Sequence, residues 1–185
     1  MKWPQWVGII LVALVVIPVG VLLVLGHRAG AGKVHASVEM AGSPGQVWVW
    51  IDDSARLKQW VSWMVEVREA NPPRHAVGST FTWVLKDENN GGMLMMLQGR
   101  LKEYAPPARL TVAIASPEYQ FAGEQTYRLT SLGNGRTRVD ADAQYHYDQW
   151  FANLMEPLVT PAAEKKMVGD LARLKTLVES QAEVH

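Results

Sequence analysis

The chain opens with a long apolar run and afterwards alternates between apolar and polar positions. Residues 7–25 contain no charged side chain. At about 1.5 Å per helical residue they are long enough to cross a hydrocarbon core of about 30 Å. Trp3 and Trp6 stand where interfacial aromatic residues are found, and spanning helices tolerate a proline such as Pro18. We therefore expect one N-terminal transmembrane helix within residues 1–28 and a single-pass membrane protein.

A cleaved signal peptide is the alternative interpretation of this segment. Lys2 supplies a minimal basic start, and the small residues 29–31 resemble a cleavage site. The apolar run exceeds the roughly 7–15 residues of a signal-peptide core, which favours an uncleaved anchor. The side of the membrane on which the rest of the chain lies stays open, because Lys2 is balanced by Arg28 and Lys33 beyond the run.

A strand and two short helices are predicted next. Residues 34–40 alternate with period two, which is typical of a half-buried strand. Ser43 can cap a helix in which Pro44 takes the first position and Gln46 completes a capping box. The acidic and hydroxyl side chains of residues 52–54 can cap a second short helix.

Period-two alternation then continues between turn signals. Asn-Gly and Gly-Asn-Gly sequences at 89–92 and 133–135 favour hairpins, and proline pairs end two of the strands. Six further strands are expected at about 65–68, 80–85, 93–104, 110–114, 121–132 and 137–147. Short turns between successive strands indicate an antiparallel meander, with seven strands in all.

The segment from Asp148 onward is predicted to be a long helix, either kinked or divided into two pieces at Pro157 and Pro161. It carries one apolar stripe at helical spacing, with Asp170 and other charged side chains around it. The stripe is Met167, Leu171, Leu174 and Val178. Such a stripe can be buried against a strongly curved sheet. We therefore expect an α+β helix-grip fold, in which a curved seven-stranded antiparallel sheet wraps around a long C-terminal helix, preceded by one transmembrane helix.

Length and composition limit the domain organisation and the classes of function that are possible for this chain. The 185 residues suffice for one anchor (1–28), a short linker (29–32) and one domain (33–185). Beyond the apolar run acidic residues outnumber Lys and Arg by one, which argues against binding nucleic acid. The chain has no cysteine, so disulfides, thiolate nucleophiles and cysteine-bound zinc are excluded.

Several segments together resemble the polyketide cyclase/START-like (SRPBCC) superfamily. The matching segments are Ala36 to Trp48, Ile51-Asp52, Trp60, Val77 to Phe81, Glu103 to Pro107, Arg109-Leu110 and Asp170 to Glu179. The resemblance covers residues 33–180 and implies a helix-grip fold with a deep, largely apolar cavity. Members of the superfamily bind lipids or other hydrophobic ligands, cyclise aromatic polyketides or assist as chaperones, and they share no universal catalytic residue.

Strand parity selects the residues expected to line such a cavity. They are Phe81, Trp83, Met93, Met95, Leu97, Leu101, Phe121, Gln125, Tyr127, Tyr145 and Tyr147. Thioethers and aromatic rings suit apolar ligands, and the three phenols and Gln125 would be the few polar groups. The alternative is that these side chains only pack the core, with their hydroxyls bonded to water or to the backbone.

Other candidate chemistry is weaker. Asp140, Asp142 and His146 share one strand face and could bind a metal, but a solvated exterior explains them more simply. Glu124 and Tyr127 are the least implausible acid/base pair for an enzyme. No nucleophile elbow, phosphate loop or dinucleotide-binding glycine pattern occurs, so we assign no catalytic residue, no metal and no cofactor.

Four tryptophans, Trp48, Trp50, Trp60 and Trp63, cluster around the two short helices. We expect them to close one end of the core, the alternative being a membrane-facing or gating surface beside the cavity. Taken together, the sequence predicts a membrane-anchored protein that binds a lipid or another hydrophobic small molecule. Its partners would be that molecule and the bilayer contacted through residues 7–25. A protein-interaction module and a cyclase/dehydratase-type enzyme stay open as alternatives.

Overall fold

The structure is a computed structural model that describes residues 3–27, 32–69, 76–87 and 91–182. Seven antiparallel strands form one sheet in the order β1-β7-β6-β5-β4-β3-β2. The strands are β1 (Lys33–Ala41), β2 (Met64–Glu69), β3 (Thr80–Asp87), β4 (Met93–Ala105), β5 (Arg109–Ser116), β6 (Phe121–Gly133) and β7 (Arg136–Tyr147). Strands β2 to β7 therefore form a meander, as the sequence predicts, whereas β1 lies beside β7 and not beside β2.

Two short helices lie between β1 and β2. Helix α2 (Pro44–Asp52) begins with the predicted capping box, in which the Ser43 hydroxyl accepts from the Gln46 N–H and the Gln46 side chain accepts from the Ser43 N–H. Helix α3 (Ser54–Trp60) begins where the Asp53 carboxylate accepts from the N–H groups of the first turn. Both predicted helices are confirmed, and they start where local side chains satisfy the free N–H groups.

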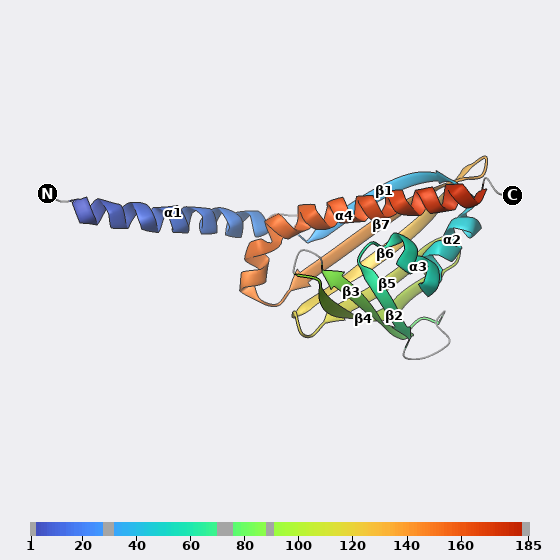
Figure 1. Cartoon of the computed structure of the whole chain (residues 1–185), viewed down its shortest axis with the longest axis horizontal. Helices are drawn as coiled ribbons and strands as arrows, with labels where there is room; N and C mark the ends of the chain where they lie inside the picture. The colour runs from blue at the N-terminus through green and yellow to red at the C-terminus, as the bar shows by residue number, and fades with distance from the viewer. Residues whose placement is uncertain (1–2, 28–31, 70–75, 88–90, 183–185) are drawn as a thin grey trace.

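The C-terminal helix α4 (Trp150–Ala182) runs along one face of the sheet, which we call the inner face (Figure 1). Leu171, Leu174 and Val178 are almost completely buried in the same core as residues of β1 and β7, so the predicted stripe is gripped by the sheet. The helix is continuous through both prolines, but Figure 1 shows its first turns bent steeply away from the rest, as prolines in a helix predict.

Helix α1 (Trp3–Gly26) projects away from the sheet, and its apolar side chains are exposed (Figure 1). It is long and apolar enough to span a membrane, a property that an N-terminal signal sequence would share. Its C-terminal end lies beside the first turns of α4. We call this end of the sheet the near end. The opposite, far end carries the turn between β6 and β7.

Candidate ligand site on the inner face

The inner face is built from rows of paired residues that cross the sheet. One row near α1 runs Phe81, Gly99, Ile114, Gly123 and Tyr145 from β3 to β7. The next row toward the far end runs Leu101, Val112, Gln125 and Ala143. Because alternate residues of a strand share a face, this register places all eleven predicted residues on the inner side, as parity predicts.

Two glycines lie in the row that contains Phe81 and Tyr145. A Cβ added at Gly99 would lie 2.1 Å from Cε2 of Phe81, and one added at Gly123 would lie 3.0 Å from Cβ of Tyr145. The Phe81 ring therefore lies directly across the backbone of Gly99, as aromatic side chains do when they cover a strand glycine. This arrangement depends on the absence of a side chain on β4 at this point.

The far half of the inner face is closed. Trp48, Trp50 and Trp60 are at most 6% exposed, and the indole N–H of Trp60 donates to the backbone oxygen of Trp50 at 2.8 Å. Trp63 is half-buried under the ammonium group of Lys166. The prediction that the tryptophans close one end of the core is confirmed. Helix α2 lies at the opposite end of the sheet from α1 (Figure 1).

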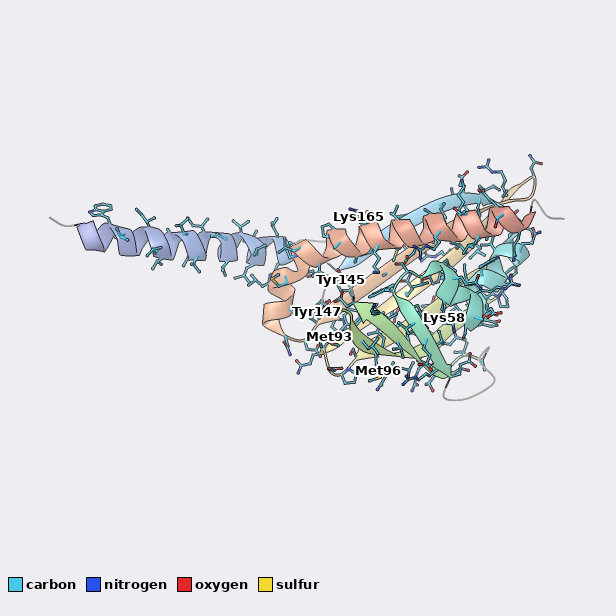
Figure 2. The ribbon with its side chains drawn as sticks, viewed as in Figure 1. Lys58, Met93, Met96, Tyr145, Tyr147 and Lys165 are labelled. Atoms are coloured by element: carbon cyan, nitrogen blue, oxygen red, sulfur yellow. The ribbon has the colours of Figure 1, made fainter. Side chains whose placement is uncertain are left out.

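The near half is more open and rich in aromatic residues. Phe121, Tyr145 and Tyr147 are half-buried and pack on one another with ring centroids 5.3–6.0 Å apart. Figure 2 shows Tyr145, Tyr147 and Met93 at the end of the sheet that faces α1. The accessible part of the predicted site therefore lies close to the apolar helix.

A small cavity lies between the sheet and the two short helices. Its volume is about 30 Å³, and it is lined by Ile51, Asp52, Leu57, Phe81, Trp83, Leu101, Leu110, Val112 and Tyr127. This volume holds about one or two water molecules. Among the described residues, the cavity on the inner face is therefore much smaller than the deep, open cavity that the family resemblance implies, because aromatic side chains occupy the space. Tyr127 packs edge-on against Trp60, and Tyr104 packs against Trp48.

The predicted site residues divide into four groups by position. Phe81, Trp83, Leu101 and Tyr127 line the small cavity. Leu97 belongs to the core, Met95 and Phe121 pack against it, and Tyr145 and Tyr147 pack on Phe121. Met93 lies beyond the covered part of the face and is 53% exposed. Gln125 is 91% buried and lies in the sheet beside Val112, which lines the cavity.

Two buried polar atoms of inward-facing strand residues have no hydrogen-bond partner among the described residues. They are Nε2 of Gln125 and Oγ of Ser116. Leaving a buried donor unpaired costs about 1–3 kcal/mol, so such groups require an explanation. A ligand oxygen reaching this part of the face would satisfy the Gln125 donor.

The titratable groups behind the site are held in their neutral forms by burial. Burial raises the pKa of Tyr127, and the neighbouring Asp170 carboxylate raises it further. Burial also raises the pKa of Tyr145, whose hydroxyl lies 2.7 Å from the hydroxyl oxygen of Thr160. Phenols with raised pKa values are hydrogen-bonding groups at neutral pH and poor bases.

Sequence reasoning missed Asp170 as an internal residue. Its side chain is only 7% exposed, it accepts from the Ser62 N–H at 3.0 Å, and burial raises its pKa. Its position directly before the stripe residue Leu171 was the available indication, because a neighbour of the stripe can face the short helices rather than water.

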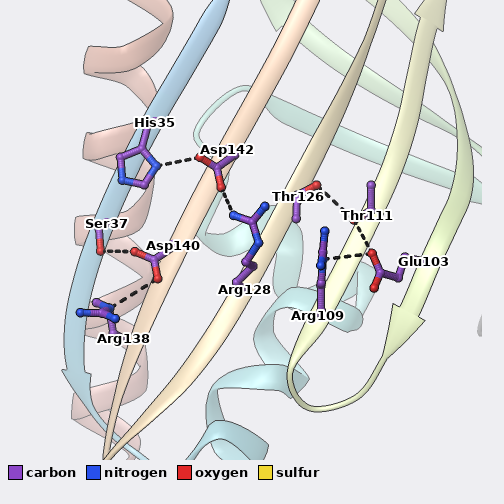
Figure 3. A network of polar contacts seen from close by, with 10 residues as sticks. All are labelled: His35, Ser37, Glu103, Arg109, Thr111, Thr126, Arg128, Arg138, Asp140 and Asp142. Carbon is purple, nitrogen blue, oxygen red and sulfur yellow. Dashed lines mark hydrogen bonds and ion pairs between the residues drawn. The ribbon is translucent and has the colours of Figure 1, made fainter.

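The outer face of the sheet carries ion pairs between neighbouring strands (Figure 3). Asp142 binds both His35 and Arg128, and Asp140 accepts from Ser37 and pairs with Arg138. These contacts account for the carboxylates that suggested a metal. Among the residues that the structure describes, no group of three or more His, Cys, Asp or Glu side chains could hold a metal ion.

Glu124 also lies on the outer face, where it pairs with Lys102. Tyr127 points to the inner face. Because an odd spacing of three positions along a strand places two side chains on opposite faces of the sheet, the predicted acid/base pair is wrong.

An open groove of about 930 Å³ crosses the outer face over Ala113, Ala115 and Gly123. It is larger than the inner cavity, but none of the unpartnered buried polar atoms belongs to the residues that line it. We therefore take the inner face as the candidate site.

Comparison with known proteins identifies the fold and the family. The family model described as polyketide cyclase/dehydrase and lipid transport matches residues 31–179. A search of curated proteins gives no match. Solved structures with the same fold include a Rhodobacter sphaeroides protein (18% identity, TM-score 0.63, covering 83% of this chain and 95% of that one) and a Nitrosomonas europaea protein (18%, 0.63, 85% and 100%). A Thermus thermophilus protein is similar to the same degree (19%, 0.63, 80% and 98%). The match of the family model extends over the whole sheet and most of α4, and the chain belongs to the polyketide cyclase/dehydrase and lipid transport family.

Proposed function

We propose that this protein binds a lipid or another hydrophobic small molecule on the near half of the inner face, while α1 holds it in a membrane. The observation that carries the proposal is the contrast along the inner face. Its far half is sealed by tryptophans, whereas aromatic and methionine side chains beside α1 are left half-buried. A half-buried apolar face with a few polar groups is typical of a site for an apolar ligand.

The ligand would enter by displacing side chains. Phe81, Trp83 and Met95 are half-buried on the inner face, and none of them donates or accepts a hydrogen bond with a described residue. Thioether and phenyl groups adapt their rotamers at modest cost. Moving them outward would join the cavity of about 30 Å³ to the near end of the sheet.

The polar groups on the inner face suggest which chemical groups the ligand contains. The unpaired amide donor of Gln125 and the hydroxyl of Ser116 are both on the inner side. An apolar molecule with one carbonyl or carboxyl oxygen would complete their hydrogen bonds while burying its hydrocarbon part. Fatty acids and other lipids with acyl groups have this chemistry.

In this proposal the chain is divided as the sequence suggests, with an anchor at 1–28, a linker at 29–32 and a ligand-binding domain at 33–185. Anchoring raises the local concentration of a membrane-derived ligand without any further contact. Binding is favoured over catalysis because Glu124 and Tyr127, the acid/base pair suggested by the sequence, lie on opposite faces of the sheet.

Native mass spectrometry of the full-length protein in detergent tests the proposal. We expect an additional mass from a bound hydrophobic molecule in the wild-type protein. The variant Met95→Trp, which fills the near half, should lose it, and the matched control Leu132→Trp on the far end should keep it. Equal ligand occupancy in both variants, or no bound ligand in the wild type after incubation with oleate, would contradict the proposal.

A further inference from the structure

The near end of the sheet exposes apolar side chains from two elements that are distant in sequence. Strand β4 contributes Met93, Leu94 and Met96, and the first turns of α4 contribute Met155, Leu158 and Val159. We call these six residues the near-end surface. Met93, Leu94, Met96 and Leu158 are each at least 50% exposed. By strand parity Met93 lies on the inner face, whereas Leu94 and Met96 lie on the outer face, so the near-end surface includes both faces at the start of β4. Exposed apolar side chains that gather at one end of a folded protein mark an interaction site.

The chain fixes this surface close to α1. The backbone oxygen of Gly32 accepts from the Tyr145 N–H at 2.8 Å, so the segment that leaves α1 is attached at the near end. The six residues between Gly26 and Lys33 can span at most roughly 20 Å when fully extended. Figure 1 shows α1 leaving the rest of the protein from this end, and Figure 2 shows Met93, Tyr145 and Tyr147 there.

We infer that the near-end surface rests in the headgroup region of the lipid bilayer, so that the inner face of the sheet opens directly toward lipid. This inference rests on the proposed role of α1 as an anchor. If α1 spans the membrane, its C-terminal end lies at the bilayer surface, and this surface runs roughly perpendicular to the helix axis. The near-end surface is then the part of the protein that faces the bilayer.

The chemistry of this end fits a bilayer better than a protein partner. Tyr145 and Tyr147 are half-buried aromatic residues with polar hydroxyls, a type enriched at membrane interfaces. Flexible methionine and leucine side chains suit the disordered boundary between headgroups and acyl chains. The apolar helix α1 contacts α4, which contributes to the near-end surface. Helix α1 and the near-end surface would therefore face lipid together.

The route of the ligand follows from this geometry. A lipid leaving the bilayer beneath the near-end surface would meet the aromatic cluster of Phe121, Tyr145 and Tyr147 before it reached water. Transfer from the membrane to the inner face would therefore avoid the cost of exposing an acyl chain to solvent.

Single-cysteine labelling tests the inference, because the full chain contains no cysteine of its own. We would attach an environment-sensitive fluorophore in turn to Met93→Cys, Leu158→Cys, Val15→Cys in α1 and Leu132→Cys at the far end. All four positions are exposed. Each protein would be reconstituted into phosphatidylcholine vesicles with and without brominated lipids, which quench only fluorophores that contact the bilayer.

We expect brominated lipids to remove most of the emission at positions 15, 93 and 158 and to leave position 132 unchanged. Quenching at Val15→Cys without quenching at Met93→Cys and Leu158→Cys would overturn the inference and leave the anchor intact. Absence of quenching at Val15→Cys would overturn the anchor itself and the inference with it. Equal quenching at all four positions would also contradict it, because the far end would then touch lipid as well.

Discussion

The position of Phe81 across Gly99 makes a sharp prediction about the inner face. In Gly99→Ala the new Cβ would stand 2.1 Å from Cε2 and 2.4 Å from Cζ of Phe81. Carbon atoms pack at about 3.5–4.0 Å, so the ring must move by more than an ångström. Such overpacking costs about 1–3 kcal/mol, and we expect Gly99→Ala to lower the free energy of unfolding by this amount.

The matched control is Gly169→Ala in α4. A Cβ there meets no atom within 4 Å, and alanine in a helix is favoured over glycine by roughly 0.5–1 kcal/mol. The control should therefore be more stable than the wild type, although both variants add the same methyl group.

A double-mutant cycle isolates the contact. Phe81→Ala removes the ring, so adding Gly99→Ala to it should cost much less than in the wild type, with a coupling energy of about 1–3 kcal/mol. Urea unfolding of the full-length protein in detergent, followed by tryptophan fluorescence, measures all four proteins. Additive effects of the two substitutions, or a Gly99→Ala variant as stable as the wild type, would refute the placement of the ring.

Three further predictions concern α4 and the ligand site. Leu174→Ala should cost about 2–5 kcal/mol in urea unfolding because its side chain is fully buried, whereas Val168→Ala on the exposed side of the same helix should stay within about 0.5 kcal/mol of the wild type. Asp170→Asn keeps an oxygen to accept from Ser62. Burial raises the pKa of Asp170 in the folded protein, so the ionised carboxylate destabilises the fold at neutral pH. This destabilisation disappears below pH 3.8, the ordinary pKa of an aspartate in the unfolded chain, because the carboxyl group is then protonated in both states. The Asn variant should therefore melt higher than the wild type at neutral pH and lose that advantage at about pH 3; an unchanged difference would contradict the burial argument. Tyr127→Phe should change the affinity for a fluorescent fatty acid by no more than about 0.5–1.5 kcal/mol, while Met95→Ala should alter it by enlarging the face; a site insensitive to Met95→Ala would not be the one proposed.

Much of the fold follows from local patterns in the sequence. The capping box at Ser43 and Gln46 fixes the start of α2 through contacts within four residues. Alternation along β6 and β7 determines which side chains share a face, and the stripe ending at Val178 identifies the buried side of α4. These features depend on near neighbours in the chain, so periodicity is sufficient to predict them.

The size of the cavity could not be predicted in the same way. It depends on how Tyr127 packs against Trp60 and how Tyr104 packs against Trp48, contacts that join elements far apart in sequence. Strand parity shows that a ring faces inward, but not whether it leaves space beside it. The separation of Glu124 from Tyr127, in contrast, was available from parity, because an odd spacing along a strand places two residues on opposite faces.

Photoaffinity mapping tests the central claim most directly. The full-length protein in phosphatidylcholine vesicles would be exposed to a fatty acid that carries a photoreactive diazirine, and the modified residues located by peptide mass spectrometry. The account predicts modification of inner-face residues near α1, such as Met95, Phe121 and Tyr145, that excess oleate abolishes. Modification confined to α1 and insensitive to oleate would contradict the claim that the sheet holds a ligand.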